Sequence, residues 1–378
     1  MRLRTILILI AAAAALLPTH AEWVNRGLCH VWDGDGTPDT PEDMLPGVIY
    51  DHNRSVKGEY FTYSGIYAEE GKGAGVGKSI KAINKIRSTG AKNPTGSPDV
   101  HGQCAYVLKQ LMRKSDDILK KLYKYPFSVA LSHVYMAPAK TSALENILSG
   151  KHSSKSDFIA DTTSSNTKAN AYKDHTSWIG IFKGTVIAPK SMKFRFCAAA
   201  DDSIIVNFDG NMVLETGYIH PDLYKGNGVK DPACCSTTER AREFQKQLAA
   251  GKIAGRKGYE VIALRSAPYT NSKFNGITCG PTISVEEGKA YPIELIISNN
   301  GGTALCYLFT QEITSGEMAQ LQLFRTSNAP VTRPYASLAT SSRYESGPAY
   351  DEDSPIWQVK GKKSKKAPKP KNQFQKMN

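Results

Sequence analysis

The stretch "WIGIFKGTVIAPKSMKFRFCAAADDSIIVNFDGNMVL", residues 178–214, decides the fold class. Its apolar residues recur at every second position, so that Met192, Phe194 and Phe196 share one face. This period is typical of β-strands, because successive strand residues point to opposite sides of a sheet. Asp209-Gly210 then separates two apolar runs by two residues, which predicts a tight hairpin turn. The stretch therefore favours antiparallel sheet.

The rest of the chain contains further runs with strand character and two segments with helical character. Ser115 and the two acids after it predict a helix over 115–123. A second helix is predicted inside 236–251, where a capping box precedes a closing glycine. We expect a mainly β chain: an antiparallel β-sandwich with one N-terminal flanking helix and one inserted helix. The further predicted strands are "YEVIALR" (259–265), "YPIELIIS" (291–298) and "TALCYLFTQEI" (303–313), with a turn at "NNGG" (299–302).

The first residues have the features of a secretory signal peptide. Arg2 and Arg4 precede an apolar run, and small residues surround a cut near Ala21. The apolar run is too short to span a bilayer as a helix, and no lipid-attachment cysteine stands at the cut. We therefore expect a secreted, periplasmic or cell-envelope-associated protein without a transmembrane segment.

The last residues are strongly basic. Eight lysines and no acid occur from Lys360 onward, which predicts disorder. Of the formal net charge of +13, this tail carries +8 and the first four residues carry +2, which leaves +3 for the rest. A specific nucleic-acid partner is therefore not expected. The tail would bind an acidic envelope polymer or a membrane surface, or would simply increase solubility, and both alternatives stay open.

Composition divides the chain into four segments. They are a signal peptide (1–21), a Gly/Lys-rich, loosely ordered lead-in (22–99), the β-sandwich domain (100–330) and a disordered Lys-rich tail (331–378). The lead-in contains "EEGKGAGVGKSI", whose ending resembles a phosphate-binding loop. Lys72 stands where that loop needs its first glycine, so we interpret the segment as a flexible connector.

Seven cysteines occur, an odd number that leaves at least one unpaired within the chain. Their spacing contains no zinc-binding pattern, and an exported chain meets an oxidising compartment. We therefore expect disulfides, whose connectivity the sequence leaves open. The cysteines are Cys29, Cys104, Cys197, Cys234, Cys235, Cys279 and Cys306.

The order of features in 178–214 resembles the bacterial protective-antigen (PA-fourteen) domain family. The shared plan is a strand, a proline turn, an aromatic strand, a double aspartate, a strand and Asp-Gly. "YPIELIISNNGGTALCYLF" looks like the late hairpin of that family, and the similarity covers roughly residues 105–330. Two departures are Ser203, where a glycine often follows the aspartates, and a long insertion over 218–258.

The resemblance implies an exported β-sandwich that binds carbohydrate. In fungal adhesin relatives, a pair of adjacent aspartates holds a Ca²⁺ ion that binds sugar hydroxyls. Only Asp201 and Asp202 match that role in this chain. Both can reach one ion only at a strand end or across a distorted peptide bond, because consecutive strand residues point apart. The alternative is structural: one aspartate caps a turn and the other is solvated.

Two carboxylates are too few for Ca²⁺, which takes six to eight oxygens. Asn207 is our candidate for a further ligand-binding residue, with the loop 299–300 and other polar residues as alternatives. Sugar rings also pack their C–H faces on aromatic residues. Tyr218, His220 and Tyr224 lie in a Gly/Pro-rich loop and are candidate sugar contacts, although Tyr218 packing under its own loop explains its presence equally well. Other polar candidates are Asp209, Asp222 and Asn227.

No arrangement of residues indicates catalysis. The histidines are scattered, and two adjacent aspartates would not straddle a glycosidic bond. We expect no enzyme, but an exported carbohydrate-binding or adhesion module assisted by calcium, with a glycan or polysaccharide as partner. The alternatives are a structural cell-envelope or assembly protein anchored by its basic tail, and a secreted hydrolase whose site carries no recognisable motif.

Overall fold

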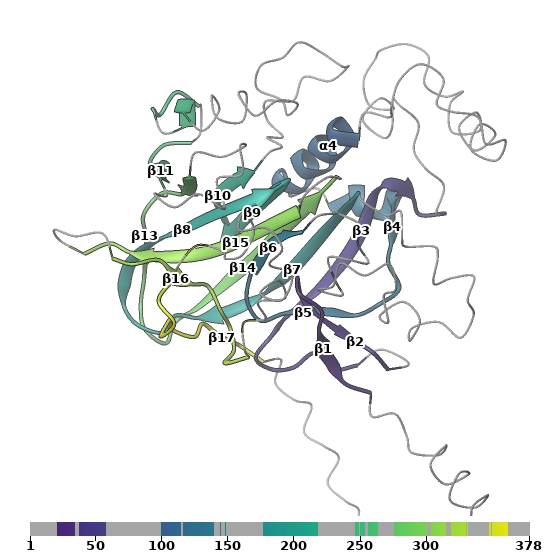
Figure 1. Ribbon diagram of the computed structural model, residues 1–378, viewed down its shortest axis with the longest axis horizontal. Coiled ribbons are helices and arrows are strands. Elements are labelled where there is room, and N and C mark those ends of the chain that lie inside the picture. The colour runs from purple at the N-terminus through teal and green to yellow at the C-terminus, as the bar shows by residue number, and fades with distance from the viewer. Residues whose placement is uncertain are drawn as a thin grey trace, which may run out of the picture.

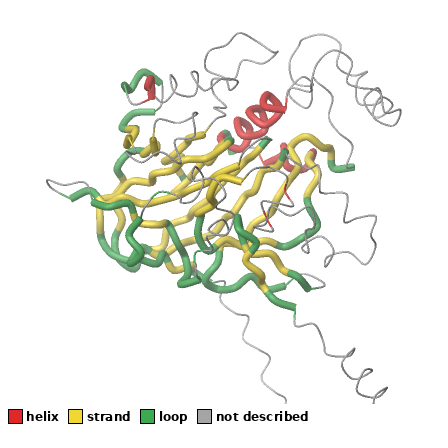
Figure 2. Tube along the Cα trace, viewed as in Figure 1, coloured by secondary structure: helices red, strands yellow, loops and turns green. Residues whose placement is uncertain are grey.

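Two antiparallel sheets build the protein, a ten-stranded and a seven-stranded one (Figures 1 and 2). They confirm the predicted antiparallel β-sandwich. The computed structural model describes residues 21–34, 38–57, 100–114, 116–139, 144, 148, 177–217, 246–248, 250–253, 256–263, 276–300, 304–314, 319–329, 331, 348 and 350–361.

Strand order places the strands of residues 178–214 in both sheets. The ten-stranded sheet runs, in spatial order, through β1 (Trp23–Asn25), β2 (His30–Trp32), β5 (Val129–Leu131), β3 (Leu45–Ser55), β7 (Trp178–Ile187), β14 (Ala290–Asn299), β9 (Ser203–Phe208) and β10 (Asn211–Gly217), with β17 (Gln358–Val359) beside β7 and β4 (Leu122–Lys124) beside β3. The seven-stranded sheet runs through β11 (Glu260–Ala263), β12 (Gly276–Cys279), β8 (Met192–Asp201), β15 (Ala304–Glu312) and β16 (Gln322–Leu323), with β13 (Ile283–Val285) beside β8 and β6 (Tyr135–Ala139) beside β15.

The main core fills the space between the sheets. Phe194 and Phe196 of β8 meet Phe208 of β9 with ring centroids 6.0 and 5.5 Å apart. Met192 shares this side, as its period-two spacing predicts. Trp178 of β7 is also fully buried. Buried aromatic rings contribute large apolar areas, so this layer holds the two sheets together.

A helix covers the outer face of the ten-stranded sheet. Apolar residues of α4 (Val100–Met112) share a buried cluster with Ile181, Ile205 and Ile296 of the strands beneath. The helix predicted over 115–123 is present at that position as a short 3₁₀ helix, η2 (Asp116–Lys121). Lys114, at φ 58°, separates η2 from α4, and β4 begins directly after η2.

The lead-in predicted as loosely ordered is in part a piece of the sandwich. Residues 22–57 include β1, β2 and β3, and β3 pairs with β7 over five registered positions from Gly47 to Asp51. Leu45 and Ile49 face the core, whereas Val48 and Tyr50 pack under α4. This strand is covered on both faces, so its sequence lacks a clear apolar and polar alternation. Residues 58–99, with the "EEGKGAGVGKSI" segment, lie outside the described residues.

The tail predicted as disordered from 331 onward also contributes to the fold. Trp357 is fully buried and contacts Phe194 at a centroid distance of 5.1 Å. The two residues after it form β17, and Lys360 N donates to Thr185 O at 2.8 Å. Tyr350, which packs on Tyr135 and Phe309, helps Trp357 to hold residues 350–361 on the sandwich. The lysines after Gly361 lie outside the described residues.

The predicted hairpin at Asp209-Gly210 is confirmed. Both residues have positive φ, 49° and 77°, as a two-residue turn between twisted strands requires. The segment at "NNGG" is different, because β14 and β15 lie in opposite sheets rather than side by side. The expected late hairpin is therefore wrong: the chain crosses there from one sheet to the other.

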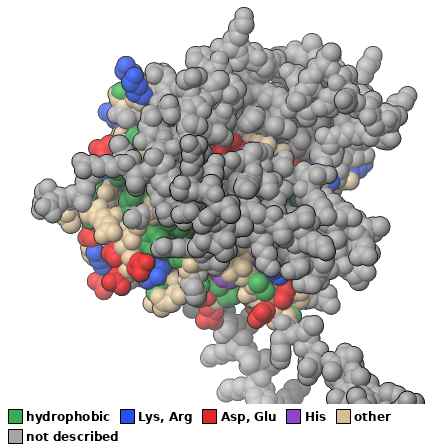
Figure 3. Space-filling model, in the orientation of Figure 1, with side chains coloured by type: hydrophobic (Ala, Val, Ile, Leu, Met, Phe, Trp, Pro, Cys, Tyr) green, Lys and Arg blue, Asp and Glu red, His purple; other side chains and the backbone are tan. Residues whose placement is uncertain are grey.

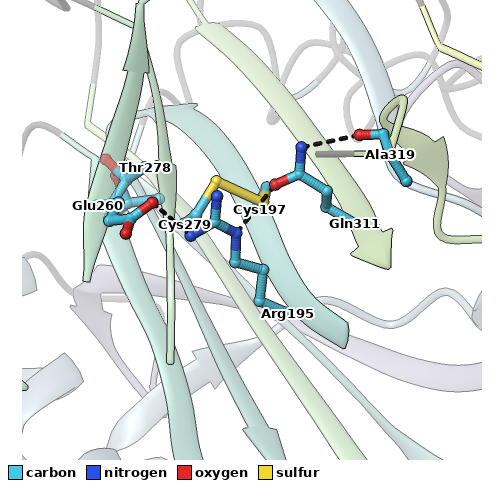
Figure 4. The surroundings of a disulfide bond; sticks show 8 residues. Arg195, Cys197, Glu260, Thr278, Cys279, Gln311 and Ala319 are labelled. Carbon is cyan, nitrogen blue, oxygen red and sulfur yellow. Dashed lines mark hydrogen bonds and ion pairs between the residues drawn. A yellow bond between two sulfur atoms is a disulfide. The ribbon is translucent and has the colours of Figure 1, made fainter. Parts of the chain in front are cut away.

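A disulfide joins neighbouring strands of the seven-stranded sheet, between Cys197 of β8 and Cys279 of β12 (Figure 4). Beside it Arg195 donates to Gln311 Oε1 at 2.9 Å and pairs with Glu260 at 2.6 Å. The expectation of disulfides is thus confirmed for one pair. Cys29, Cys104 and Cys306 are buried thiols. Cys234 and Cys235 lie outside the described residues.

The predicted inserted helix lies mostly outside the described residues. Residues 246–248 are helical, and Gly251, at φ 66°, closes the turn after them as predicted. On the face drawn in Figure 3, acidic and basic side chains of the described residues are intermingled. Within the described part of the chain, no helix is both long and apolar enough to cross a bilayer.

Candidate functional site

Asp201 and Asp202 lie where the chain passes from one sheet to the other. Asp201 ends β8 and pairs with Leu305 in the seven-stranded sheet. Ser203 begins β9 and pairs with Ser298 in the ten-stranded sheet. The peptide bond between the two aspartates is cis. The double aspartate is therefore at a strand end, as a shared site for both carboxylates requires.

A second crossing lies against the first. β14 ends at Asn299 and β15 begins at Ala304, again in opposite sheets. Asn299 Nδ2 donates to the Asp201 carbonyl at 2.8 Å, and the Asn300 backbone N–H donates to the Asp202 carboxylate. Asp202 N donates in turn to Ser298 O at 3.0 Å. These hydrogen bonds join residues 98 positions apart in sequence. We call Asp201, Asp202, Asn299 and Asn300 together the rim site.

Burial makes this rim site electrostatically demanding. Asp201 and Asp202 are 1% and 2% exposed, and Asn300 is 6% exposed. Both the Oδ1 and the Nδ2 atom of Asn300 are buried without a nitrogen or oxygen partner among the described residues. A buried carboxylate is costly unless hydrogen bonds, an ion pair or a metal offsets its desolvation. The buried double aspartate therefore needs neighbouring hydrogen-bond donors or a bound cation to offset its desolvation.

Cys104 of α4 lies beside the same residues. Burial raises the pKa of its thiol to about 12; the side chains of Ser298 and Asn300 oppose that rise, and the charge of Asp202 adds to it. A thiol with such a pKa is protonated at neutral pH and behaves as a small apolar group. Cys104 therefore packs the rim site from the helix side.

Gly217, the last described residue of β10, sets the distance of that strand from the aspartates. A Cβ built on Gly217 would lie 2.2 Å from the Asp202 carbonyl oxygen and 2.6 Å from Ser203 Cα. Its φ of 136° is also one that residues with a side chain rarely adopt. Only glycine lets the backbone of β10 approach this closely.

His52 is a rim residue that sequence reasoning missed. It is fully buried, its ring Nε2 lies 3.4 Å from the Asn299 carbonyl oxygen, and its backbone N donates to Ser177 O at 3.3 Å. His52 comes from β3, in the segment predicted as a lead-in, so no local motif connected it with the aspartates. The only sequence signal is the exchange of apolar for polar residues at "YDHN", residues 50–53.

The structure brings together only part of the predicted site. Asn207 Nδ2 donates to Glu294 Oε1 at 2.7 Å, and Asn207 lies five residues from Asp202 along β9, roughly 16 Å in an extended strand. Asn207 therefore lies outside the rim site, whereas Asn299 and Asn300 belong to it. The predicted residues Tyr218, His220 and Tyr224, and the alternatives Asp222 and Asn227, lie outside the described residues.

The donor set of the rim site defines the ion that it suits. Carboxylate and amide oxygens are hard ligands, which Ca²⁺ prefers, whereas zinc sites use His and Cys. No group of three or more His, Cys, Asp or Glu side chains with metal-binding geometry occurs in the ranges that the structure describes. Asp201, Asp202 and Asn300 would therefore fit a calcium ion as a partial shell.

No known protein family matches the chain, and no curated protein does. Solved structures do resemble it, and they include PA14 domains, the kind of domain that residues 178–214 resemble. The PA14 domain of the MpAFP antifreeze protein is 11% identical with a TM-score of 0.32, over 76% of this chain and 90% of that one. The PA14 sugar-binding domain of an RTX adhesin is 13% identical with a TM-score of 0.26, over 52% and 72%.

The A domain of epithelial adhesin 6 from Candida glabrata, solved with Galβ1-3GlcNAc, is 13% identical with a TM-score of 0.29, over 78% of this chain and 89% of that one. At such TM-scores the likeness is too remote to transfer a ligand or a binding residue to this chain.

Proposed function

We propose that this chain is an exported, non-catalytic carbohydrate-binding or adhesion module, and that its rim site holds a calcium ion that takes part in sugar binding. The proposal rests on one observation. Two neighbouring crossings between the sheets bring the buried double aspartate against Asn299 and Asn300, where the Asn300 N–H donates to the Asp202 carboxylate and the Asn300 side chain has no nitrogen or oxygen partner among the described residues.

Each rim residue has a defined part in this proposal. The Asp201 and Asp202 carboxylates and Asn300 Oδ1 would hold the cation, because they are oxygen ligands on the two segments that these hydrogen bonds join. The Asn299 side chain fixes the backbone at Asp201, and His52 supports Asn299 from β3. A bound Ca²⁺ accepts six to eight oxygens, so it would keep positions for a pair of sugar hydroxyls.

Sugar recognition would also need flat apolar contacts next to the ion. Tyr218, His220 and Tyr224 remain our candidates, because their segment follows directly after Gly217, whose backbone lies against Asp202. Galβ1-3GlcNAc, bound to the epithelial adhesin 6 domain, is a suitable first probe.

Export is part of the proposal. The signal-peptide pattern of residues 1–21 supports it, as does the Cys197–Cys279 disulfide, because such bonds persist in oxidising compartments. The location would be secreted, periplasmic or at the cell envelope.

Calcium titration followed by glycan binding tests this function. We expect isothermal titration of the exported protein to detect one Ca²⁺ site, and a glycan array to give signals that EDTA removes. Asp202→Ala should abolish both, whereas Asp209→Asn, in the exposed turn at the other end of β9, should change neither. Glycan binding that is equal with EDTA and in Asp202→Ala would exclude the calcium site. No glycan binding under any condition would exclude the lectin function.

The alternative is a structural envelope protein anchored by its basic tail, which the run of lysines at the C-terminus favours. β17 belongs to the sheet, so a clean test removes only residues 362–378. Loss of envelope association with glycan binding intact would favour anchoring by the tail. Retained association would exclude it.

A further inference from the structure

The first described residues form a closed end of the β1–β2 ladder. Trp23 pairs with Trp32, and one step further out Asp33 holds both backbone groups of Glu22. Asp33 N donates to Glu22 O at 3.1 Å, and Glu22 N donates to Asp33 Oδ1 at 2.5 Å. Beyond the three registered pairs, the Asp33 carboxylate thus replaces one of the two backbone hydrogen bonds that a fourth pair would make.

Neighbouring contacts fix this end of the strand. The rings of Trp23 and Trp32 lie 5.9 Å apart between centroids, and Trp23 Nε1 donates to Asp39 O at 3.2 Å. Ala21 and Glu22 are exposed. The backbone nitrogen of Glu22 is therefore held in place, while the residue before it reaches solvent.

The sequence puts a processing signal at the same point. The small-residue ending of the signal-peptide pattern closes at Ala21, so a cut after it would release the nitrogen of Glu22 as a free α-amine. That nitrogen is the one that already donates to Asp33.

We propose that the Ala21–Glu22 peptide bond is the processing site of this chain, and that the α-ammonium group released there forms an ion pair with the Asp33 carboxylate, closing edge strand β1. The step is a hydrolysis by a signal peptidase. Water breaks the bond between the carbonyl carbon of Ala21 and the nitrogen of Glu22, Ala21 leaves as a carboxylate, and the nitrogen of Glu22 takes up protons as an ammonium.

Charge explains why this position suits a chain end. An amide N–H gives one hydrogen bond to the carboxylate, whereas an ammonium offers three donors and adds its own positive charge. Near this end of the hairpin the described acids are Glu22 itself, Asp33 and Asp39, which favour the ammonium form, and the described base is Arg26, in the β1–β2 turn at the other end. A cut one residue later would remove both Glu22 bonds, and a cut one residue earlier would leave an amide opposite Asp33.

The cleavage position is tested by intact mass and N-terminal sequencing of the exported full-length gene product. We expect a single chain that begins at Glu22. A first residue other than Glu22, or an uncut chain in the exported fraction, overturns the proposal.

The ion pair is tested by the rate at which acetic anhydride acetylates the α-amine near pH 7.5, followed by mass spectrometry of the N-terminal peptide. An ammonium held by Asp33 reacts slowly, so Asp33→Asn should raise the rate roughly two- to fivefold, the range of an exposed ion pair. Asp39→Asn is the matched control, because Trp23 uses only the backbone oxygen of Asp39. It should change the rate less than Asp33→Asn.

A version that starts at Ala21 completes the design. Its α-amine lies one residue away from the Asp33 carboxylate, so Asp33→Asn should leave its acetylation rate unchanged. Equal rates for the processed protein and its Asp33→Asn variant overturn the ion pair. A similar rise for the version that starts at Ala21 attributes the effect to general charge and overturns it as well.

Discussion

The two ends of β9 carry acidic residues of opposite character. At the far end, Asp209 and Gly210 form an exposed two-residue turn whose positive φ angles suit the hairpin itself. At the near end, Asp201 and Asp202 are buried, and their partners come from a crossing almost a hundred residues later in the chain. The turn follows from local sequence, although Pro292 and Lys114 also contact it, whereas the second end exists only after both sheets have assembled.

This difference separates acids that shape the chain from acids that can bind a ligand. An exposed turn aspartate keeps its hydration and needs no compensating charge. A buried pair must be offset by hydrogen bonds or a cation, so its cost makes it sensitive to both. Substitutions at the two ends of one strand therefore form matched pairs.

The largest contrast is expected for the stabilising effect of calcium. At a Ca²⁺ concentration of 100 times Kd, the wild-type protein should gain about 2.7 kcal/mol in unfolding free energy. Asp202→Ala should lose this whole gain, and its folded state should also lose about 1–3 kcal/mol because the Asn300 N–H loses its acceptor. Asp209→Asn should keep the gain. Urea unfolding in calcium and in EDTA measures both, and an equal gain in Asp202→Ala would remove the contrast.

The next contrast compares two glycines of β10 and its turn. Gly217→Ala should destabilise the protein by about 3 kcal/mol, because the new Cβ meets the Asp202 carbonyl at a disallowed φ. Gly210→Ala has no atom within 4 Å of its new Cβ, so only the cost of its positive φ, about 1 kcal/mol, remains. Thermal and urea unfolding compare the two. Similar losses would mean that the close approach at the rim relaxes easily.

The pH limits where the rim variants can be compared, because acid also destabilises the protein at buried histidines. Burial, with His30 and Arg325 nearby, lowers the pKa of His133 to about 4, and burial also lowers the pKa of His30. The unfolded state therefore binds more protons below about pH 6.5, so stability is full above that pH and falls as the pH drops toward 4. For His133 we expect a loss of about 1.5 kcal/mol between pH 6.5 and 5. His133→Gln should flatten that slope in urea unfolding, and the rim variants are best compared above pH 7.

The smallest expected effect concerns support of the rim site from β3. His52→Ala should weaken Ca²⁺ binding about tenfold, as loss of a supporting group does, because the Asn299 segment loses its contact with the ring. His52→Gln, which keeps an amide in place of the ring nitrogen, should restore most of the affinity. Ser177→Ala is the matched control, because Ser177 accepts from His52 only through its backbone carbonyl. Isothermal titration calorimetry measures the Ca²⁺ affinity of each variant. Equal Ca²⁺ affinities in all three variants would show that His52 is only a core residue.

Strands could be predicted from the sequence where only one face of the strand packs on the core. Met192, Phe194 and Phe196 lie inward as their spacing predicts, and the Asp209-Gly210 hairpin forms where predicted. β3 was missed because the core and α4 cover both of its faces. β17 was missed because buried aromatic contacts, Trp357 above all, hold that part of the chain, whereas the lysines that follow it set the predicted disorder.

The sequence alone determined what period and turn chemistry control: antiparallel strands, their inward faces, and a double aspartate between two of them. Only the tertiary structure decided that β14 and β15 lie in opposite sheets, and that Asn299, Asn300 and His52 meet Asp201 and Asp202. The physical reason is how far apart in the sequence the interacting residues lie. Alternation and tight turns depend on neighbouring residues, whereas the rim site needs two sheet crossings and a distant strand to pack together before its hydrogen bonds can form.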